Sequence, residues 1–524
     1  MTPRRSSALL MALLLVGCSD DGPGTADTQG TPDTIVADTA SGDGGVDASD
    51  GGGDALPATP GCSKTCGADE VCFQGACASA GPQLACGSDT FASGLPSSGT
   101  ILYVDASASA PGDGTRTLPY RTIAAALAAI PDGQHATVAI AAGTYDEELT
   151  IGQRASGAFS ADLYCRCPDM VRITRPLTVR PHVTATELTV RVHGCTIAPS
   201  GFDADTASAW PSCNGGSGDT VGLHAAGGKL AALNVLVEES VVAGWCAGVQ
   251  FSAEPDPLLA SSLCIAHSRV AGNVTGLDAR TAPQAKIGAG PFAACSTLVE
   301  SIGVTRSRVD HNRDYGVYLR TSARGIALDA NVIERSGQLG STSGGEGFGV
   351  YLGDIDSATL TTNIVRDNDN RGIALRNETA KVSTGVTIEN NRILANAGAG
   401  IALQKLSATF YVRARGNHVS GTRARGSEPG GDGIQVSLDE GSPYNVEVSG
   451  NLVDGSARVG IFYDGVGGSV TNNVVSKSAS YGLYLQRTSS VNVGGNSWRD
   501  NGAGTRFTSA TLQLKYGALP TPPP

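Results

Sequence analysis

A short motif recurs through the chain: a Gly, an aliphatic residue, a variable residue and an apolar residue. Successive copies are 22 to 40 residues apart, and the shortest spacings are 22 and 23 residues. Such a period is typical of proteins built from stacked repeats, so it restricts the fold more than any other feature. The ten copies are GLHA at 222, GVQF at 248, GLDA at 276, GVYL at 316, GVYL at 349, GIAL at 372, GIAL at 400, GIQV at 433, GIFY at 460 and GLYL at 482.

A second motif, an Asn followed by a variable and an aliphatic residue, lies between many of these copies. Alternation along a strand places its Asn and its aliphatic residue on the same side, toward the interior. An inward Asn in every coil can form a ladder in which each amide bonds to the backbone and to the Asn above and below. The five ladder candidates are Asn331, Asn363, Asn391, Asn451 and Asn473.

Together the two motifs predict an all-β solenoid over residues 100–515, followed by a Pro-rich tail at 516–524 that cannot extend a sheet. The Gly of each repeat supplies a corner where a side chain would obstruct the turn. A β-propeller is the alternative, but its blades need about 40–50 residues and aromatic markers. The 70 Gly residues and the low aromatic content, 5%, agree with a turn-rich β protein.

The segment "PYRTIAAALAAI" (119–130), followed by "TVAIAAGTYDEELTI" (137–151), marks the start of the solenoid. We expect a short helix near 122–130, a strand at 137–141, a turn at 143–145 and then another strand. This stretch resembles the N-terminal segment of right-handed parallel β-helix proteins of the pectate-lyase-like superfamily. The resemblance implies a right-handed parallel β-helix whose short helix covers the open end of the first coil, the capping that solenoids require.

The first 18 residues are typical of an export signal, because Arg4 and Arg5 precede an apolar run too short to span a bilayer. The residues "LVGC" (15–18) resemble the lipobox of bacterial lipoproteins, which implies that a lipidated Cys18 anchors the chain in a lipid bilayer. Ser19 after the Cys implies the outer membrane by the same resemblance. The alternative is an ordinary cleaved signal peptide. Residues 19–60 hold nine Asp and no other charged residue, and predict a disordered acidic linker.

Twelve cysteines remain after Cys18, an even number that indicates a set of disulfides in an exported chain, with the pairing left open. Four of them lie within "CSKTCGADEVCFQGAC" (62–77), which is too short to support a core. This stretch resembles short Cys-rich modules of bacterial surface proteins and predicts a small disulfide-rich module at 61–90. A zinc site is the alternative, but the stretch has no neighbouring His.

The net charge of −12 is unevenly distributed. The acidic linker accounts for −9 and the first 18 residues for +2, which leaves −5 for residues 62–524. A near-neutral body lacks the basic surface that binding to nucleic-acid phosphates needs. No nucleic-acid partner is therefore expected.

The eight residues "VDHNRDYG" (309–316) contain Asp310 and His311, the pair most suggestive of catalysis. Three later segments have the same length from Val to Gly: "VRDNDNRG", "VDGSARVG" and "VSKSASYG". The place of His311 is taken there by Asp, Gly and Lys, whereas the place of Asn312 keeps a small polar residue. A position that accepts such different residues is solvated, so the segment is interpreted as a polar turn.

A functional interpretation is kept beside that one, because an active site on a solenoid is a single deviant coil. Asp310 and His311 are candidates for a catalytic base, with Arg308 beside them. Asp310, Asp314 and Asp329 are candidates for Ca²⁺ ligands, in the manner of pectate lyases. Arginines on successive coils are candidates for binding an anionic sugar chain, with plain solubility as the alternative: Arg306, Arg320, Arg324, Arg366, Arg371 and Arg376.

These features predict a lipid-anchored β-helix on the outer membrane, facing the periplasm or the cell exterior. We expect a non-catalytic module that binds acidic polysaccharide or another surface component and needs no cofactor. The alternative is a lyase or epimerase acting on uronate polymers, with Ca²⁺ if it is a lyase. Three enzyme motifs, Asp-Pro-His, Gly-His-Gly and "DFIFG", are missing from the chain, and three Trp offer little surface for stacking on neutral sugars.

Overall fold

The structure, a computed structural model, describes residues 62, 64, 66–109, 112–154, 157–213, 220–227, 231–252, 260–280, 286–287, 295, 302–320, 325–339, 342–376, 385–404, 411–426, 430–437, 445–465, 467–487 and 491–509. Cys18, the linker at 19–60, the tail at 516–524 and Arg324 lie outside these residues, so the predictions about them stay predictions. Within the part of the chain that the structure describes, no helix is long and apolar enough to cross a membrane.

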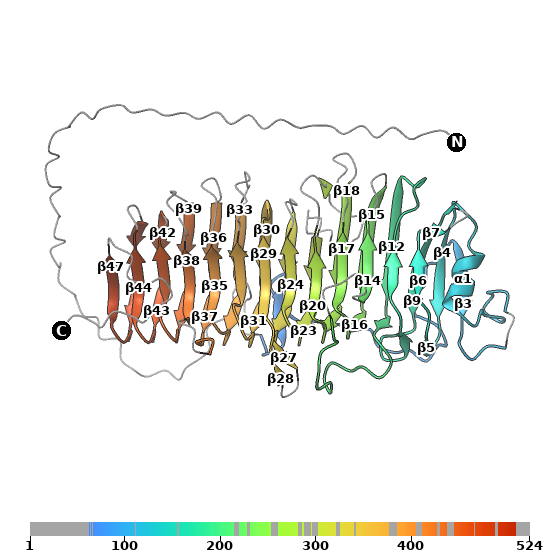
Figure 1. Ribbon diagram of the computed structural model, residues 1–524, viewed down its shortest axis with the longest axis horizontal. Coiled ribbons are helices and arrows are strands. Elements are labelled where there is room, and N and C mark those ends of the chain that lie inside the picture. The colour runs from blue at the N-terminus through green and yellow to red at the C-terminus, as the bar shows by residue number, and fades with distance from the viewer. Residues whose placement is uncertain are drawn as a thin grey trace, which may run out of the picture. The chain divides into compact units, whose positions relative to one another are not determined.

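Three long parallel sheets run side by side along one axis, from α1 and β3 at one end to β47 at the other (Figure 1). The chain winds around this axis, and each coil adds one strand to the first, then to the second and then to the third sheet. The strands of successive coils pair in parallel, as in β20 with β24 and β23 with β26. The molecule is a right-handed parallel β-helix, which confirms the predicted fold.

The first sheet consists of β3 (Thr100–Val104), β4 (His135–Ile140), β9 (Ser160–Cys165), β12 (Glu187–His193), β15 (Ala232–Glu238), β18 (Ala260–Ala266), β22 (Ile302–Thr305), β25 (Ile326–Asp329), β30 (Ser357–Thr361), β33 (Gly385–Glu389), β36 (Tyr411–Arg415), β39 (Asn445–Ser449), β42 (Gly468–Thr471) and β45 (Val491–Gly494), with β21 (Lys286–Ile287) beside β18. The second sheet consists of β5 (Gly143–Tyr145), β10 (Val171–Ile173), β13 (Thr196–Ile197), β16 (Val241–Ala243), β19 (Arg269–Ala271), β23 (Arg308–Asp310), β26 (Val332–Glu334), β31 (Ile364–Arg366), β34 (Arg392–Leu394), β37 (His418–Ser420), β40 (Leu452–Asp454), β43 (Val474–Ser476) and β46 (Ser497–Arg499).

The third sheet consists of β6 (Leu149–Ile151), β11 (Leu177–Val179), β14 (Val221–Ala226), β17 (Ala247–Ser252), β20 (Thr275–Ala279), β24 (Tyr315–Arg320), β29 (Phe348–Gly353), β32 (Ile373–Arg376), β35 (Ala399–Gln404), β38 (Asp432–Ser437), β41 (Ile461–Asp464), β44 (Tyr481–Gln486) and β47 (Gly504–Ser509). In each of the ten Gly motifs the Gly is either the second residue of a strand of this sheet or the residue directly before one. Three antiparallel hairpins accompany the sheets: β1 (Glu70–Phe73) with β2 (Ala76–Ser79), β7 (Gln153–Arg154) with β8 (Gly157–Ala158), and β27 (Gln338–Leu339) with β28 (Thr342–Ser343).

The core is a set of aliphatic stacks that run along the axis. Leu319, Leu352, Leu375 and Leu403 are paired in register from coil to coil, and none of them is exposed. Burial of each such side chain contributes about 1.5–3 kcal/mol. Alternation along the strands turns the intervening residues outward, where they are free to differ between coils.

Buried asparagines line the first corner, where the chain passes from the first to the second sheet. The backbone N–H and the Nδ2 of Asn391 both donate to Oδ1 of Asn417 at 3.0 Å, and its Nδ2 also donates to the Leu360 carbonyl at 2.9 Å. The residue ahead of the ladder position has left-handed backbone in several coils, for example Ala330 with φ 54°. The predicted ladder is confirmed and includes two further members in the described coils: Asn331, Asn363, Asn391, Asn417, Asn451, Asn473 and Asn496.

A second ladder lines the second corner, between the second and third sheets. The backbone N–H and Nδ2 of Asn273 both donate to Oδ1 of Asn312 at 3.1 Å, and Nδ2 of Asn368 donates to Asn396 at 2.8 Å. This ladder accounts for the Gly of the repeat motif. A Cβ on Gly372 would lie 2.8 Å from Nδ2 of Asn396 and 2.8 Å from the carbonyl of the next Gly along the axis.

The N-terminal end of the solenoid is closed by α1 (Ile123–Ala129), as predicted. The Thr122 hydroxyl accepts a hydrogen bond from the Ala125 N–H at 3.1 Å and caps the helix, whose Ile123 and Leu127 are buried in the core. The prediction of a turn at 143–145 was wrong. These residues form β5, because their backbone pairs with β10 of the next coil.

All twelve cysteines after Cys18 form disulfides, which confirms the predicted set. The pairs are Cys62–Cys72, Cys66–Cys77, Cys86–Cys167, Cys165–Cys195, Cys213–Cys246 and Cys264–Cys295. The third pair joins the Cys-rich segment to the solenoid. The hairpin of that segment (blue in Figure 1) lies against the middle of the solenoid, near β23 and β31.

Residues 66–91, called the strap from here on, run along the outside of the solenoid. Asp69 contacts Arg366 of β31, Leu84 contacts Glu239 ahead of β16, and Phe91 packs against Ala139 of β4. The strap therefore passes the coils in reverse order, from β31 back to β4. At about 4.8 Å per strand this is a path of roughly 34 Å along the axis.

Candidate functional site

The predicted catalytic residues lie together at a second corner. Asp310 ends β23, and His311 follows with left-handed backbone, φ 55°. Nδ1 of His311 lies 2.7 Å from Oδ2 of Asp310, and Nε of Arg308 lies 3.7 Å from Oδ1 of Asp310. The segment is a polar turn between β23 and β24, as interpreted, but the expectation that it is solvated was wrong. Asp310 is fully buried, Asn312 belongs to the second ladder, and only 12% of the His311 side chain is exposed.

A loop from an earlier coil covers this pair. Nε1 of Trp210 donates to the His311 carbonyl at 2.7 Å. Arg269 donates to Asp310 at 2.9 and 2.6 Å and to Asp205 of the covering loop at 2.8 and 2.6 Å. One guanidinium thus bonds to two carboxylates, one in the solenoid and one in the loop. Such paired bidentate contacts fix the geometry of both groups.

Both carboxylates of this cluster are stabilised in their ionised form. Burial alone would raise the pKa of Asp310, but hydrogen bonds from His311 and Arg269 hold it well below its usual range. The same guanidinium lowers the pKa of Asp205. Ligand atoms of Asp205, Asp310 and His311 lie within 4.8 Å of one another, as in a metal site. Arg269 already supplies the positive charge, so the cluster serves best as an ion-pair network that anchors the loop.

The three predicted calcium ligands are not brought together. Asp310 bonds to Arg269, whereas Asp314 accepts hydrogen bonds from Arg313 at 3.1 and 3.0 Å. Asp329 accepts hydrogen bonds from Thr361 and Thr362 at the first corner, at 2.6 and 2.9 Å. Among the described residues, neither Asp314 nor Asp329 belongs to a group of three ligands close enough to share an ion. The predicted set of calcium ligands is therefore wrong.

The predicted strip of arginines is divided between two faces. Arg306, Arg308 and Arg366 lie on or beside the second sheet, beneath the strap. Arg320, Arg371 and Arg376 lie on or beside the third sheet. The described members lie on two coils, that of β22–β24 and that of β30–β32, with one coil between them. The sequence did not indicate which outward face each arginine joins.

Four aromatic rings form two stacks on the third sheet. Tyr318 and Tyr351 stack with centroids 5.3 Å apart and planes 11° apart, and Tyr315 and Phe348 stack at 5.5 Å and 13°. Arg280 lies 5.2 Å from the Tyr318 ring centroid, and a second arginine lies 5.7 Å from that of Phe348. Cations over aromatic faces in this range are attracted by the ring quadrupole. Counting Trp alone missed this surface, although two of the Gly motifs, both GVYL, contain its Tyr residues.

Three arginines share one outward row beside these rings. Arg280 and Arg320 follow residues that are paired in register, and Gly353 separates Arg320 from Arg376 in the same row. The Cα atoms of successive arginines in this row are therefore about 4.8 and 9.6 Å apart along the axis. The side chains of Arg280 and Arg320 are 63% and 54% exposed, although each lies near an Asp, Asp278 at 2.9 Å and Asp354 at 3.5 Å.

A cluster of titratable side chains on the first sheet escaped the sequence analysis. His193 is paired in register with Tyr164 on one side and Glu238 on the other. Its ring lies 5.1 Å from the Tyr164 ring, and its Nδ1 lies 3.4 Å from Oε2 of Glu238. Arg191 donates to the Tyr164 hydroxyl at 2.6 Å, and the hydrogen bond from His193 lowers the pKa of Glu238. The coils before 222 lack the Gly motif, so their register was not visible in the sequence.

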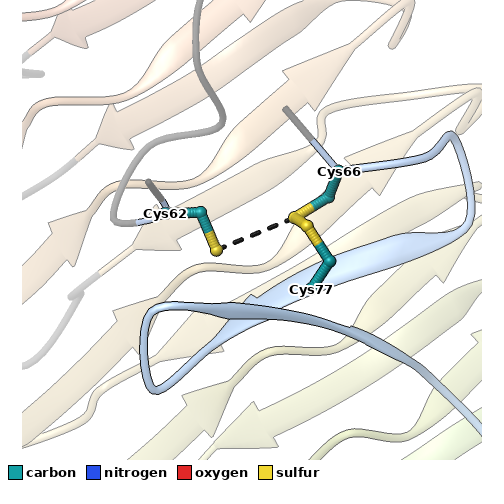
Figure 2. Close-up of side chains that lie close together, drawn as sticks. All are labelled: Cys62, Cys66 and Cys77. Atoms are coloured by element: carbon teal, nitrogen blue, oxygen red, sulfur yellow. Dashed lines mark hydrogen bonds between the residues drawn. A yellow bond between two sulfur atoms is a disulfide. The ribbon is translucent and has the colours of Figure 1, made fainter. Parts of the chain in front are cut away.

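The cysteines of the strap offer no metal site. The sulfur atoms of Cys62, Cys66 and Cys77 lie within 4.8 Å of one another, and Sγ of Cys66 lies 3.7 Å from that of Cys62. Figure 2 shows why this group is not a zinc site: Cys66 and Cys77 are joined by a disulfide. Cys62 is likewise bonded to Cys72, so no thiolate remains among these four.

Two family models match parts of the chain. One, described as a right handed beta helix region, matches residues 294–441, and the other, described as a periplasmic copper-binding protein (NosD), matches residues 403–513. Neither match reaches half of the chain. A comparison with curated proteins gives no match.

Several solved structures of low sequence identity are similar to this chain. The periplasmic alginate epimerase AlgG is 13% identical with a TM-score of 0.46, covering 72% of this chain and 83% of its own. The pectate lyase Pel9A is 12% identical with a TM-score of 0.31, covering 78% and 80%. PfbA, a surface adhesin of Streptococcus pneumoniae, is 12% identical with a TM-score of 0.38, covering 76% and 91%. The sheet topology and the matching family model identify this chain as a right-handed parallel β-helix protein.

Proposed function

We propose that the protein binds acidic polysaccharide through the outward face of the third sheet. The binding surface, called the arginine–tyrosine face, consists of Arg280, Tyr318, Arg320, Tyr351 and Arg376. The observation that carries the proposal is the row of three guanidinium groups beside a stacked pair of rings. Guanidinium groups form paired hydrogen bonds with carboxylates, and tyrosine rings provide apolar contact for sugar rings.

The repeat of the solenoid suits a linear polymer. The backbone positions of these arginines recur at whole multiples of the strand spacing, about 4.8 Å, so a chain with regularly spaced carboxylates can lie along the axis and contact several of their side chains. Multiple weak contacts on one chain add to the total affinity. We propose no catalytic step and no cofactor for this binding.

We place this function outside the cytoplasm. Six disulfides within the chain are typical of an oxidising compartment. The predicted export signal and lipidated Cys18 would hold the chain at the outer membrane. Mass spectrometry of the mature N-terminus, with a Cys18→Ala variant for comparison, tests this; an unmodified N-terminus in the native protein would exclude the lipid anchor.

The binding test uses polygalacturonate and alginate as acidic ligands, with neutral dextran as reference. Arg280→Gln combined with Arg320→Gln should weaken binding to the acidic polymers by about ten-fold or more, as expected for the loss of about 1.4 kcal/mol. Arg413→Gln is the matched control, because Arg413 lies 4.7 Å from the Tyr411 ring on the first sheet and is 52% exposed. Equal losses in both proteins, or equal binding of dextran, would refute the proposal.

A second candidate function is a lyase or epimerase reaction on uronate polymers, favoured by the first-sheet cluster. Tyr164, Arg191, His193 and Glu238 bring a phenol, a guanidinium, an imidazole and a carboxylate together on adjoining coils. Such groups can accept and donate protons beside a bound anion. This places the candidate base at the first-sheet cluster, whereas the sequence-based prediction placed it at Asp310 and His311.

Incubation with a panel of uronate polymers, with and without Ca²⁺, tests catalysis. Absorbance of an unsaturated product reports a lyase, and the uronate composition of the recovered polymer reports an epimerase. Activity lost in His193→Ala and kept in His311→Ala would support the first-sheet cluster. The reverse pattern would support the sequence-based assignment, and no activity in the native protein leaves the binding proposal alone.

A further inference from the structure

The strap covers the arginines on or beside the second sheet: Arg306, Arg308 and Arg366. The Phe73 ring lies 4.3 Å from the guanidinium of Arg306, and the Gly81 N–H donates to the Arg306 carbonyl at 2.8 Å. Arg308 lies 4.0 Å from Asp69. These contacts leave the side chain of Arg308 27% exposed and that of Arg366 only 16% exposed.

The strap meets these arginines with oxygen acceptors. Nη2 of Arg366 donates to the Asp69 carboxylate at 2.6 Å, and Nη1 donates to the Ala68 carbonyl at 2.9 Å. The Arg366 hydrogen bond lowers the pKa of Asp69. A carboxylate and a neutral oxygen side by side on one guanidinium are the same acceptors that a uronate residue would present.

Carboxylates of the solenoid also contact the arginines beneath the strap. The buried carboxylate of Glu334 bonds to both Arg308 and Arg366, at 2.6 Å in the case of Arg366. Arg306 has no such partner at this distance among the described ion pairs, and burial lowers its pKa. Oδ1 of Asp310 also lies 3.7 Å from Nε of Arg308, and Asp69 of the strap adds a carboxylate from outside the solenoid.

The two ends of the strap are held in different ways. The end near Cys86 is bonded covalently to the solenoid through Cys167. The end at 66–81 is held by Val71, which packs against Val332 and Ile364, and by the arginine contacts described above. Contacts of this kind can open without breaking a covalent bond, so one end of the strap can leave while the other stays.

We propose that residues 66–81 of the strap are a displaceable occupant of a second polyanion-binding surface, formed by Arg306, Arg308 and Arg366. When this end of the strap leaves, an acidic polysaccharide takes its place on the same guanidinium groups. The strap and the polymer then compete, and the strap sets how tightly this surface binds. This surface is separate from the arginine–tyrosine face, so the inference stands whether or not that face binds glycans.

The test is carried out in a protein whose arginine–tyrosine face has been disabled by Arg280→Gln and Arg320→Gln. Adding Asp69→Asn should raise the affinity for polygalacturonate several-fold and speed hydrogen exchange at 68–81. Adding Arg366→Gln should then abolish the gain. Asp89→Asn is the matched control, because Asp89 of the strap also bonds to an arginine at 2.6 Å, Arg116, away from this surface.

A second measurement does not depend on Asp69→Asn folding normally. In the disabled protein without strap substitutions, excess polygalacturonate should speed hydrogen exchange at 68–81, and dextran should not. Slower or unchanged exchange at saturating polymer would refute displacement. An equal affinity gain in Asp89→Asn, or a gain that survives Arg366→Gln, would refute the assignment of the surface.

Discussion

Each buried asparagine of the first corner serves three coils at once. Asn391 accepts hydrogen bonds from the backbone N–H and the Nδ2 of Asn363, and it donates to Asn417 and to the Leu360 carbonyl. A buried N–H that loses its acceptor costs the free energy of its desolvation. The amide side chain is therefore required by the backbone of its neighbours as much as by its own coil.

Replacing Asn391 by Ala should lower the free energy of unfolding by about 2–4 kcal/mol, because it leaves polar groups of two neighbouring coils unpaired. Urea unfolding followed by circular dichroism measures this. Asn492→Ala is the control, because Asn492 is an exposed residue of β45. That variant should stay within about 0.5 kcal/mol of the native protein. Equal losses in the two variants would contradict the ladder's role.

His267 gives the region under the strap a pH dependence. Burial lowers the pKa of His267 below 6.5, and the nearby Arg306 adds to the shift, whereas Glu238 and Glu239 oppose it. The folded state thus takes up the proton less readily than the unfolded state. The contribution of neutral His267 to the free energy of unfolding is fully present above pH 6.5. It decreases as the pH falls below that value and stops changing below the pKa of His267 in the folded state.

We predict that the unfolding temperature of the native protein decreases when the pH is lowered from 7 to 5, and that the unfolding temperature of His267→Gln decreases less. Thermal unfolding across this range measures both. His182→Gln is the control, since His182 is an exposed His whose Nδ1 lies 2.7 Å from the Thr184 hydroxyl. Its pH profile should match that of the native protein. A His267→Gln profile parallel to the native one would contradict the assignment.

At the scale of one strand, the repeat position requires Gly because a side chain and a backbone carbonyl of the next coil approach it closely. Gly372 precedes β32 and needs no left-handed backbone; a Cβ there would meet Nδ2 of Asn396 and the Gly400 carbonyl, both at 2.8 Å. The repeat Gly and the asparagines of the second ladder therefore pack against each other at the same corner. The Gly motif was clear in the sequence, whereas the second ladder was visible only as a small polar residue at Asn312 and its equivalents.

Gly372→Ala should lower stability by about 1–3 kcal/mol, as for other overpacked positions. Gly494→Ala is the control, because Gly494 likewise has no left-handed backbone and nothing lies within 4 Å of a Cβ built on it. Urea unfolding of the two variants separates close approach from a general cost of replacing Gly. A control that loses as much as Gly372→Ala would contradict the explanation.

The fold of the whole molecule was predictable because its rules are local and repeated. Ten Gly motifs and five asparagines recur with the coil period, and each copy confirms the others. The strap had no such signal: Asp69 and Arg366 are 297 residues apart and occur once. The same holds for Asp205 with Asp310 and for His193 with Glu238, whose contacts depend on which coil follows which. Sequence reasoning therefore singled out Arg306, Arg366 and the Asp310–His311 pair, but it did not indicate what covers them.

Loss of the strap's covalent link should weaken the whole molecule. Replacing Cys86 and Cys167 by Ala opens a loop closed over 81 residues, whereas replacing Cys62 and Cys72 opens one closed over 10. By chain entropy the first change should cost about 2 kcal/mol more than the second. Denaturant unfolding of the two double variants measures the difference. A smaller loss for the longer loop would show that the strap adds little to stability.

The reversed path of the strap also decides how the molecule responds to a mechanical load. A pull on the chain ahead of Cys62 first reaches the solenoid at β31, where the strap is held by separable contacts that open one after another. The covalent stop comes only at Cys86. The disulfides Cys62–Cys72 and Cys66–Cys77 keep the hairpin from extending, so only the roughly nine residues from Cys77 to Cys86 can be drawn out, about 30 Å of extended chain. After that the force enters near β10, close to the end capped by α1, and the molecule swings to align its axis with the pull. Under such a load the separable contacts of the strap would therefore open before the coils carry the force.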